Sequence, residues 1–311
     1  MKLKKPKFWD NKKPSLLSYF LLPLTLPIII NNFFLKKKIK SVQNIKKVCV
    51  GNIYVGGTAK TPLTIKLSQI LQELNFKTAT VKKFYKDQLD EQILLNGKSK
   101  LYCKKNRIDA LNDAVEDGID VAIFDDGLQD AHLNYDLSFL CFNNITWIGN
   151  GFLMPSGPLR EKLKSILKYD AIFLSGNEED NSDIKSSIQK ISKNIKIFET
   201  YYKPINLHKL NIEHKYIIFS GIGNPNSFKK TLLKYKFKII KEMNFPDHYQ
   251  YTIEDIEKIN SIATDLNAKI ITTEKDFVKI PLENSKNINF LEIDLVIKNQ
   301  DQLISFIKSK I

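Results

Sequence analysis

The chain has 311 residues, 43% of them hydrophobic, so it is long enough for two domains and too apolar for wholesale disorder. Its net charge of +14 comes almost entirely from lysine, since Arg107 and Arg160 are the only arginines. Nucleic-acid-binding proteins usually rely on arginine, so we expect no nucleic-acid partner; an anionic membrane surface, an anionic substrate or a bias toward lysine explains the charge as well.

The N-terminal part contains a strongly apolar stretch, "LLSYFLLPLTLPIII" (Leu16–Ile30), flanked by lysines that include Lys36–Lys38. It is shorter than the ~20 residues of a membrane-spanning helix, and Pro23 and Pro27 would break or kink a helix. No small-residue cleavage site of a signal peptide follows it. We therefore predict that residues 1–40 form a bent, membrane-associated element lying in the interface. The alternative is a helix packed on the protein's own core.

Strand and helix signals alternate along the rest of the chain. The run "KKVCVGNIYV" predicts a strand that closes on Gly51, and apolar residues at helical spacing follow over Leu63–Leu74. The alternation pauses in an extended, helix-poor stretch near residues 195–212 and then restarts. This order predicts an α/β fold of parallel βαβ units, with a larger domain over residues 41–200 and a smaller α/β domain over residues 201–311.

The stretch "VGNIYVGGTAKTPLTIKL" joins the first of these strands to the first helix through a turn of small residues. Such a turn exposes backbone N–H groups at a helix N-terminus, where Lys60 can reach the β- and γ-phosphates of a nucleotide and the Thr61 hydroxyl can hold Mg²⁺. The predicted nucleotide-binding residues are Gly56, Gly57, Thr58, Ala59, Lys60 and Thr61. The alternative is an ordinary turn with an exposed lysine.

Two positions of this turn depart from the phosphate-loop pattern GxxxxGK[ST]. The pattern requires glycine at positions 54 and 59, whereas the chain has Tyr54 and Ala59. One methyl group at position 59 is tolerable if φ is negative and costly if φ is positive. The sequence does not decide between these two conformations.

A second motif supplies the acidic half of a nucleotide site. The run "VAIFDDGLQD" predicts a buried strand that ends at Asp125 and Asp126, where P-loop enzymes hold Mg²⁺ or its water ligands. Either motif alone is weak, because an ordinary strand and turn would also contain it. Together, in this order and in separate βα units, they predict an NTP site with Thr61, Asp125 and Asp126 around the metal.

Several longer stretches resemble the tetraacyldisaccharide 4'-kinase (lipid A 4'-kinase) family. In family order they are "VGNIYVGGTAKTP", "DDGLQD", "GNGFLMPSGPLRE", "FSGIGNPNSF", "FPDHYQYT" and "TTEKDFVKI". The resemblance implies a P-loop NTPase-like fold and phosphorylation, dependent on ATP and Mg²⁺, of the 4'-hydroxyl of a lipid disaccharide 1-phosphate. It also implies a peripheral position on the cytoplasmic face of the inner membrane, and we expect no obligate protein partner.

The resemblance places an acid and a histidine in catalytic roles. The segment "LDEQ" is similar to the family's GDEP stretch, which puts the catalytic aspartate at Asp90, and the histidine of the family's DH pair corresponds to His248. Asp90 would accept the hydroxyl proton, and His248 would orient it or share that role. Alternatively, His248 caps the helix that starts near Ile253, or pairs with Asp247. Because Asp90 and His248 fall in different predicted domains, their joint action would place the active site in the cleft between the domains.

The resemblance also supports roles for the basic residues. Lys60 matches the family's P-loop lysine, and Arg107 and Arg160 fall where the family also has arginine. A planar guanidinium suits bidentate contact with phosphate, so both arginines are predicted substrate contacts. Retention of two arginines by chance is the alternative.

Three departures from the family pattern leave a second hypothesis open. Ala59 replaces a glycine, "KKFYKD" replaces an SRGYGG-like run with a shortened loop up to Asp90, and His132 stands in an arginine's place. Ala59 and the shortened loop motivate the competing hypothesis of a non-catalytic, membrane-associated nucleotide-binding protein with a decayed P-loop.

Overall fold

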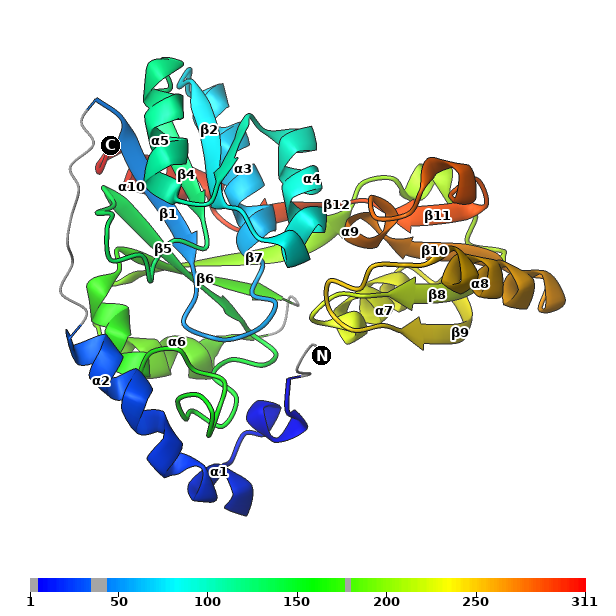
Figure 1. Cartoon of the computed structure of the whole chain (residues 1–311), viewed down its shortest axis with the longest axis horizontal. Coiled ribbons are helices and arrows are strands. Elements are labelled where there is room, and N and C mark those ends of the chain that lie inside the picture. Colours follow the sequence, from blue (N-terminus) through cyan, green and yellow to red (C-terminus); the bar gives the residue numbers. More distant parts are fainter. Residues whose placement is uncertain (1–4, 35–43, 177–179) are drawn as a thin grey trace. The chain divides into compact units, whose positions relative to one another are not determined.

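The computed structural model describes residues 5–34, 44–176 and 180–311, so the lysines at 36–38 lie outside the described residues. It divides into two compact units, each made of separate chain segments. The first unit comprises residues 1–84, 98–201 and 295–311, and the second comprises residues 85–97 and 202–294. Each unit contains its own mostly parallel sheet, which confirms the predicted α/β class (Figure 1).

The units differ from the contiguous domains predicted over residues 41–200 and 201–311. Residues 85–97 belong to the second unit, where Asp90 pairs with His248 at 2.9 Å. Asp90 and His248 therefore lie in one unit, and the expectation that they sit in different domains was wrong. The order of strands and helices does not reveal which sheet a helix packs against, because that depends on contacts between residues far apart in the chain.

The described strands of the first unit form an eight-stranded sheet in the order β12-β7-β6-β5-β1-β4-β2-β3. Its strands are β1 (Lys46–Gly51), β2 (Thr78–Lys83), β3 (Leu101–Lys104), β4 (Val121–Asp125), β5 (Leu137–Asn143), β6 (Ala171–Gly176), β7 (Lys196–Pro204) and β12 (Ile293–Ile297). From β3 across to β7 all neighbours pair in parallel, so their carboxyl ends meet at one edge. Pairing of Val50 with Asp125 brings the two predicted motifs together at that edge.

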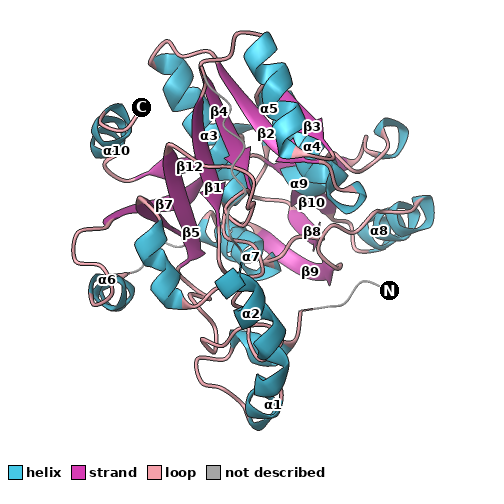
Figure 2. Ribbon diagram, turned by 60° about the vertical axis from the view of Figure 1, so that its left-hand side comes forward, coloured by secondary structure: helices cyan, strands magenta, loops and turns pink. Residues whose placement is uncertain are grey.

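Helices cover both faces of this sheet (Figure 2). They include α3 (Lys60–Glu73), α5 (Arg107–Glu116), α6 (Ser182–Gln189) and α10 (Gln300–Lys308), with the 3₁₀ helix η4 (Leu163–Lys168). The side chains of Leu140 and Ala110 share one core cluster, so α5 covers that face of the sheet. The adjacent Phe139 points to the other face and meets Phe306 of α10. The aromatic contacts of Phe306 explain why the C-terminal helix returns to the first unit.

The N-terminal segment is bent, as its prolines predict. It consists of η1 (Lys7–Asp10), α1 (Leu16–Phe20), η2 (Leu22–Thr25) and α2 (Leu26–Phe34), drawn in blue in Figure 1. Pro23 lies in η2 and Pro27 in the first turn of α2, so each proline sits where a helix begins rather than in its interior. No helix among the described residues is long and apolar enough to cross a membrane.

Many of the large apolar side chains of this segment are exposed. Leu16 is 89% exposed and Phe20 is 80% exposed. The other exposed large apolar residues here are Leu17, Tyr19, Leu22, Leu24, Leu26 and Ile30. The polar Ser18, in contrast, is fully buried and accepts a hydrogen bond from Asn150. Packing on the protein therefore accounts for only part of the apolar character of the segment, through residues such as Trp9 and Ile29.

The described strands of the second unit form a parallel sheet in the order β11-β10-β8-β9. The strands are β8 (Lys215–Ser220), β9 (Lys238–Asn244), β10 (Lys269–Thr273) and β11 (Ile288–Leu291). The helices are α4 (Leu89–Lys98), α7 (Pro225–Lys234), α8 (Ile253–Asp265) and α9 (Glu274–Phe277), with short 3₁₀ turns η3 (Lys86–Gln88), η5 (Leu207–Lys209) and η6 (Leu282–Asn284). Successive residues Ile217 and Ile218 join different apolar clusters, so both faces of this sheet are buried.

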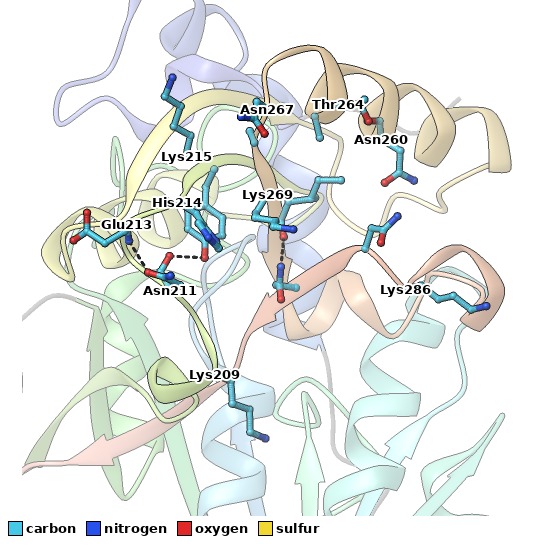
Figure 3. Close-up of a pocket in the computed structure, with 16 residues that line it drawn as sticks. Lys209, Asn211, Glu213, His214, Lys215, Asn260, Thr264, Asn267, Lys269 and Lys286 are labelled. Carbon is cyan, nitrogen blue, oxygen red and sulfur yellow. Dashed lines mark hydrogen bonds between the residues drawn. The ribbon is translucent and has the colours of Figure 1, made fainter.

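A pocket of about 960 Å³ lies in the second unit, at the amino ends of β8, β10 and β11 (Figure 3). Lysines and asparagines dominate its polar lining, including Lys215, Lys269, Asn211 and Asn267. None of the residues predicted as site residues lines it. Ligands of parallel α/β sheets usually bind at the carboxyl ends of the strands, which is the opposite end of this sheet.

Candidate active site

The turn between β1 and α3 is held by hydrogen bonds at several points. Buried Asn52 donates from Nδ2 to the Thr58 hydroxyl at 2.8 Å, which fixes the small-residue part of the turn. The backbone N–H of Val55 donates to the carbonyl of Pro158 at 2.9 Å. Gly56 has φ +144°, a conformation that side chains rarely adopt. The turn is therefore a defined loop that leads into the N-terminus of α3 at Lys60.

Ala59 adopts the left-handed conformation, with φ +63° and ψ +25°. For an L-amino acid this conformation costs roughly 1–2 kcal/mol, so alanine occupies a glycine-type position. The sequence did not show whether φ of residue 59 is negative or positive. It is positive, so the methyl group of Ala59 costs conformational free energy. The loop keeps this conformation because the surrounding hydrogen bonds and the start of α3 hold the backbone in place despite the strain.

Replacing Ala59 by glycine should stabilise the nucleotide-free protein by roughly 1 kcal/mol, because glycine adopts this backbone conformation without strain. Thermal unfolding should then shift upward by about 2–4 °C. Lys236→Gly is a matched control, since Lys236 has φ +63° outside the loop. It should give a similar shift without a change in ATP affinity. A lower melting temperature for Ala59→Gly would contradict the strain.

The basic residues of the site contact Asp126. Its carboxylate lies 3.3 Å from Nη1 of Arg160 and 3.9 Å from Nζ of Lys60, and its carbonyl accepts a 2.6 Å hydrogen bond from Nη2 of Arg107. Burial opposes ionisation of Asp126, but the charges of Lys60 and Arg160 outweigh it and hold its pKa below the usual value. Asp126 also has φ +60°. The structure thus brings Lys60, Arg107 and Arg160 together around one carboxylate.

Arg107 and Arg160 differ in burial and in their contacts with other residues of the protein. The side chain of Arg107 is buried and also binds Asp130, with Nη1 3.2 Å from Oδ2. Arg160 is partly exposed. It lies at the end of the stretch "GNGFLMPSGPLRE", and its backbone N–H donates to the carbonyl of Ile53 at 2.7 Å. Arg107 is therefore a group that positions Asp126, whereas Arg160 presents its guanidinium at the surface of the site.

The loop before Arg160 is built around Asn150. Its Nδ2 donates to the carbonyl of Ser156 at 2.9 Å, and its Oδ1 accepts from the N–H of Phe152 at 3.1 Å. A Cβ at Gly157 would lie 2.1 Å from Oδ1 of Asn150, so only glycine fits there. The N–H of Asn150 also donates to the carbonyl of Trp9, which ties the N-terminal segment to this loop.

Asp125 lies beside Thr61 and a lysine that the sequence reasoning missed. One carboxylate oxygen, Oδ2, accepts hydrogen bonds from the Thr61 hydroxyl at 3.0 Å and from Nζ of Lys82 at 2.7 Å. The other oxygen, Oδ1, is buried without a hydrogen-bond partner among the described residues. The sequence did contain a sign of this role. Lys82 stands near the end of an apolar strand, inside the "KKFYKD" run that departs from the family pattern.

The residues present fit a nucleotide-bound Mg²⁺. Such ions take one or two carboxylates with a Thr hydroxyl and the phosphates, rather than an all-protein cage. The hydroxyl of Thr61 and the unpartnered Oδ1 of Asp125 offer these donors. Accordingly, the described part of the chain contains no group of three or more His, Cys, Asp or Glu residues arranged for a metal. The carboxylate of Asp126 is already engaged by Arg160 and Lys60.

Asp90 and His248 form a close pair in the second unit. The Nδ1 atom of His248 lies 2.9 and 3.0 Å from the two carboxylate oxygens of Asp90, whose side chain is fully buried. Burial opposes ionisation of Asp90, but the hydrogen bond from His248 and the charge of Lys275 lower its pKa. His248 has φ +58°. The pair therefore contains an ionised aspartate that fixes the ring of a partly exposed histidine.

The alternative roles of His248 are not supported by the geometry. Helix α8 is capped by Thr252, whose side chain accepts from the N–H of Asp255 in a capping box. Asp247 lies farther from the ring, with its Oδ1 3.8 Å from Nε2. The interpretation of His248 as a helix cap was therefore wrong, and Asp90 is its nearer carboxylate partner.

Lys275, which the sequence reasoning did not single out, lies beside this pair. Its Nζ is 3.3 Å from Glu91, 3.5 Å from Asp247 and 3.6 Å from Asp90. Burial opposes the charged form of Lys275, but these carboxylates raise its pKa above the usual value. The signal was available in the run "TTEKDFVKI", which follows a predicted strand.

Comparisons with known proteins bear on this arrangement. The model of the tetraacyldisaccharide-1-P 4'-kinase family matches residues 20–101 and 89–311. A tetraacyldisaccharide 4'-kinase of Pelagibacter ubique is 46% identical over 303 residues, covering 97% of this chain and 96% of the relative. That of Rickettsia typhi is 33% identical over 326 residues, covering 97% of each chain.

The chain belongs to the tetraacyldisaccharide-1-P 4'-kinase family. The resemblance inferred from its sequence motifs is thereby confirmed. A crystal structure of the family member LpxK from Aquifex aeolicus, described as a complex with ATP, has a similar fold. The TM-score is 0.70 at 24% identity, covering 94% of this chain and 99% of LpxK.

Proposed function

We propose that this family member is an ATP-dependent kinase that transfers the γ-phosphate to the 4'-hydroxyl of a tetraacyldisaccharide 1-phosphate, a late step of lipid A biosynthesis. Relatives that match nearly the whole chain are named tetraacyldisaccharide 4'-kinase. The observation that carries the proposal is the meeting of Lys60 and Thr61 with Asp125 and Asp126 at one sheet edge.

The nucleotide is bound by the loop and the groups around it. Backbone N–H groups at the N-terminus of α3 and the ammonium of Lys60 face the phosphates, where a helix N-terminus favours negative charge. Thr61 and Asp125 would hold Mg²⁺, and that ion would supply positive charge to neutralise the phosphates. Arg160 contacts a phosphate of the bound substrates, and Arg107 keeps Asp126 in place.

Proton removal from the acceptor hydroxyl is assigned to the pair of Asp90 and His248. Asp90 is fully buried and holds Nδ1 of the ring, so His248 is the member that can meet a hydroxyl, through Nε2. The negative charge of Asp90 fixes the ring tautomer and stabilises the imidazolium that forms. The hydrogen bond from His248 and the charge of Lys275 lower the pKa of Asp90, which favours its ionised form.

The competing hypothesis is a nucleotide-binding protein without catalysis, and the strained Ala59 is the observation in its favour. Incubation with labelled ATP, Mg²⁺ and the lipid disaccharide 1-phosphate separates the two. Transfer of label to the lipid supports the kinase. Retained ATP binding without transfer would instead support a decayed loop.

The proposed location is the cytoplasmic face of the inner membrane, with the N-terminal segment as a peripheral anchor. The outward-facing apolar side chains of α1, such as Leu16 and Phe20, match an interfacial helix whose apolar side enters the acyl boundary. A basic net charge adds attraction to anionic lipid.

The double variant Leu16→Asp/Phe20→Asp should bind anionic vesicles at least tenfold more weakly than the parent protein. Burial of each large apolar side chain contributes on the order of 2 kcal/mol, and both side chains are highly exposed in the protein. Vesicle co-sedimentation measures the effect. Leu167→Asp, at an exposed leucine of η4, is the control and should bind normally. Equal binding by all three proteins would remove α1 from the membrane contact.

A further inference from the structure

Lys82 is a buried cation at the carboxyl end of β2. Strands β2 and β4 pair in parallel with Val81 opposite Phe124, so the next residues, Lys82 and Asp125, emerge side by side at the nucleotide edge of the sheet. The side chain of Lys82 is 3% exposed and that of Asp125 is 0% exposed. Their 2.7 Å contact is therefore a desolvated ion pair.

A purely structural role does not readily explain this pair. The desolvation free energy of two buried charges exceeds their mutual attraction unless other groups also form hydrogen bonds with them. Apolar residues at such positions are therefore often at least as stabilising as an ion pair. Here Thr61 satisfies the same oxygen that Lys82 contacts, while Oδ1 of Asp125 has no hydrogen-bond partner among the described residues. The arrangement places the ammonium group of Lys82 against a carboxylate of the metal site.

The charges around the phosphate position decide what this lysine contributes. Asp125, Asp126 and Asp130 supply three negative charges, and Lys60, Lys82, Arg107 and Arg160 supply four positive charges. Without Lys82 the count is balanced, and the triphosphate would meet an uncompensated Asp125. A divalent cation would then be required to bring the triphosphate beside that carboxylate.

We propose that Lys82 is a phosphate-site residue whose fixed charge lets this protein bind ATP without a divalent cation. The inference rests on the proposed function only in taking this loop as the ATP site. Mg²⁺ remains a requirement of transfer, so binding and transfer differ in their need for metal.

The test measures ATP binding by calorimetry in EDTA and in Mg²⁺, with no lipid present. The parent protein should bind ATP in EDTA within tenfold of its affinity in Mg²⁺. Lys82→Met should lose at least tenfold in EDTA and less than threefold in Mg²⁺, and Lys82→Arg should retain most of the EDTA affinity. Lys83→Met removes the same charge from the neighbouring position and should leave the ratio of the two affinities unchanged.

Several results would overturn the proposal. One is a parent protein whose affinity falls more than tenfold in EDTA, which can be read even if Lys82→Met does not fold. Another is a Lys82→Met variant that loses affinity equally in both buffers, as a structural role alone would give. Absence of ATP binding in both buffers would refute the ATP site itself, whereas binding without transfer to lipid would leave this inference standing and refute only the kinase proposal.

Discussion

Replacing Lys60 by alanine should lower kcat for phosphoryl transfer by on the order of 10²–10³, with the fold intact. Lys60 begins α3, and the proposed function places its ammonium against the phosphates. Removal of a single charge-stabilising donor from such a place typically has an effect of this size. Asp126, its ion-pair partner, lies 3.9 Å from Nζ, and the lysine side chain is partly exposed. The substitution therefore removes little packing, and thermal unfolding should change little.

The measurement is single-turnover transfer of labelled phosphate to the lipid acceptor, with circular dichroism to check the fold. Lys66→Ala is a matched control because Lys66 belongs to the same helix, beyond its first turn, and should keep parental activity. An unaltered kcat for Lys60→Ala would remove Lys60 from the site.

Asp90→Asn and His248→Ala should each lower kcat by about 10²–10⁴ with little change in the KM for ATP. Asparagine keeps the size of Asp90, which matters because the side chain is fully buried and has Lys275 and Lys279 within 4 Å. It removes the charge that fixes the ring of His248. Since the two residues act as one unit, the double variant should be far less impaired than the product of the single losses.

Steady-state kinetics of the four proteins forms a double-mutant cycle. Two losses that multiply would contradict joint action of Asp90 and His248, although each residue would keep a role of its own. Asp87→Asn is the matched control, because Asp87 lies three residues before Asp90 and is exposed. If Asp90→Asn were fully active and Asp87→Asn were not, the shortened loop would have been misaligned and Asp87 would be the catalytic aspartate.

The candidate site was predictable wherever its chemistry is local in the sequence. A small-residue turn followed by Lys60 and Thr61, and a buried strand ending at Asp125, each show their role within about ten residues. The contacts of Lys82 and Lys275 were not predictable in this way. Each lysine meets carboxylates that are distant in the chain, and in this lysine-rich sequence neither lysine stands out.

The α/β class, the bent N-terminal segment and the place of the phosphate loop follow from local sequence, because hydrophobic periodicity, prolines and glycines act over a few residues. The positive φ of Ala59 does not, since the closure of the whole loop sets that dihedral. Tertiary packing also places Asp90 with His248 in one unit and returns α10 to the other. Those outcomes depend on packing and charge between segments that are distant in the chain, which a local pattern does not contain.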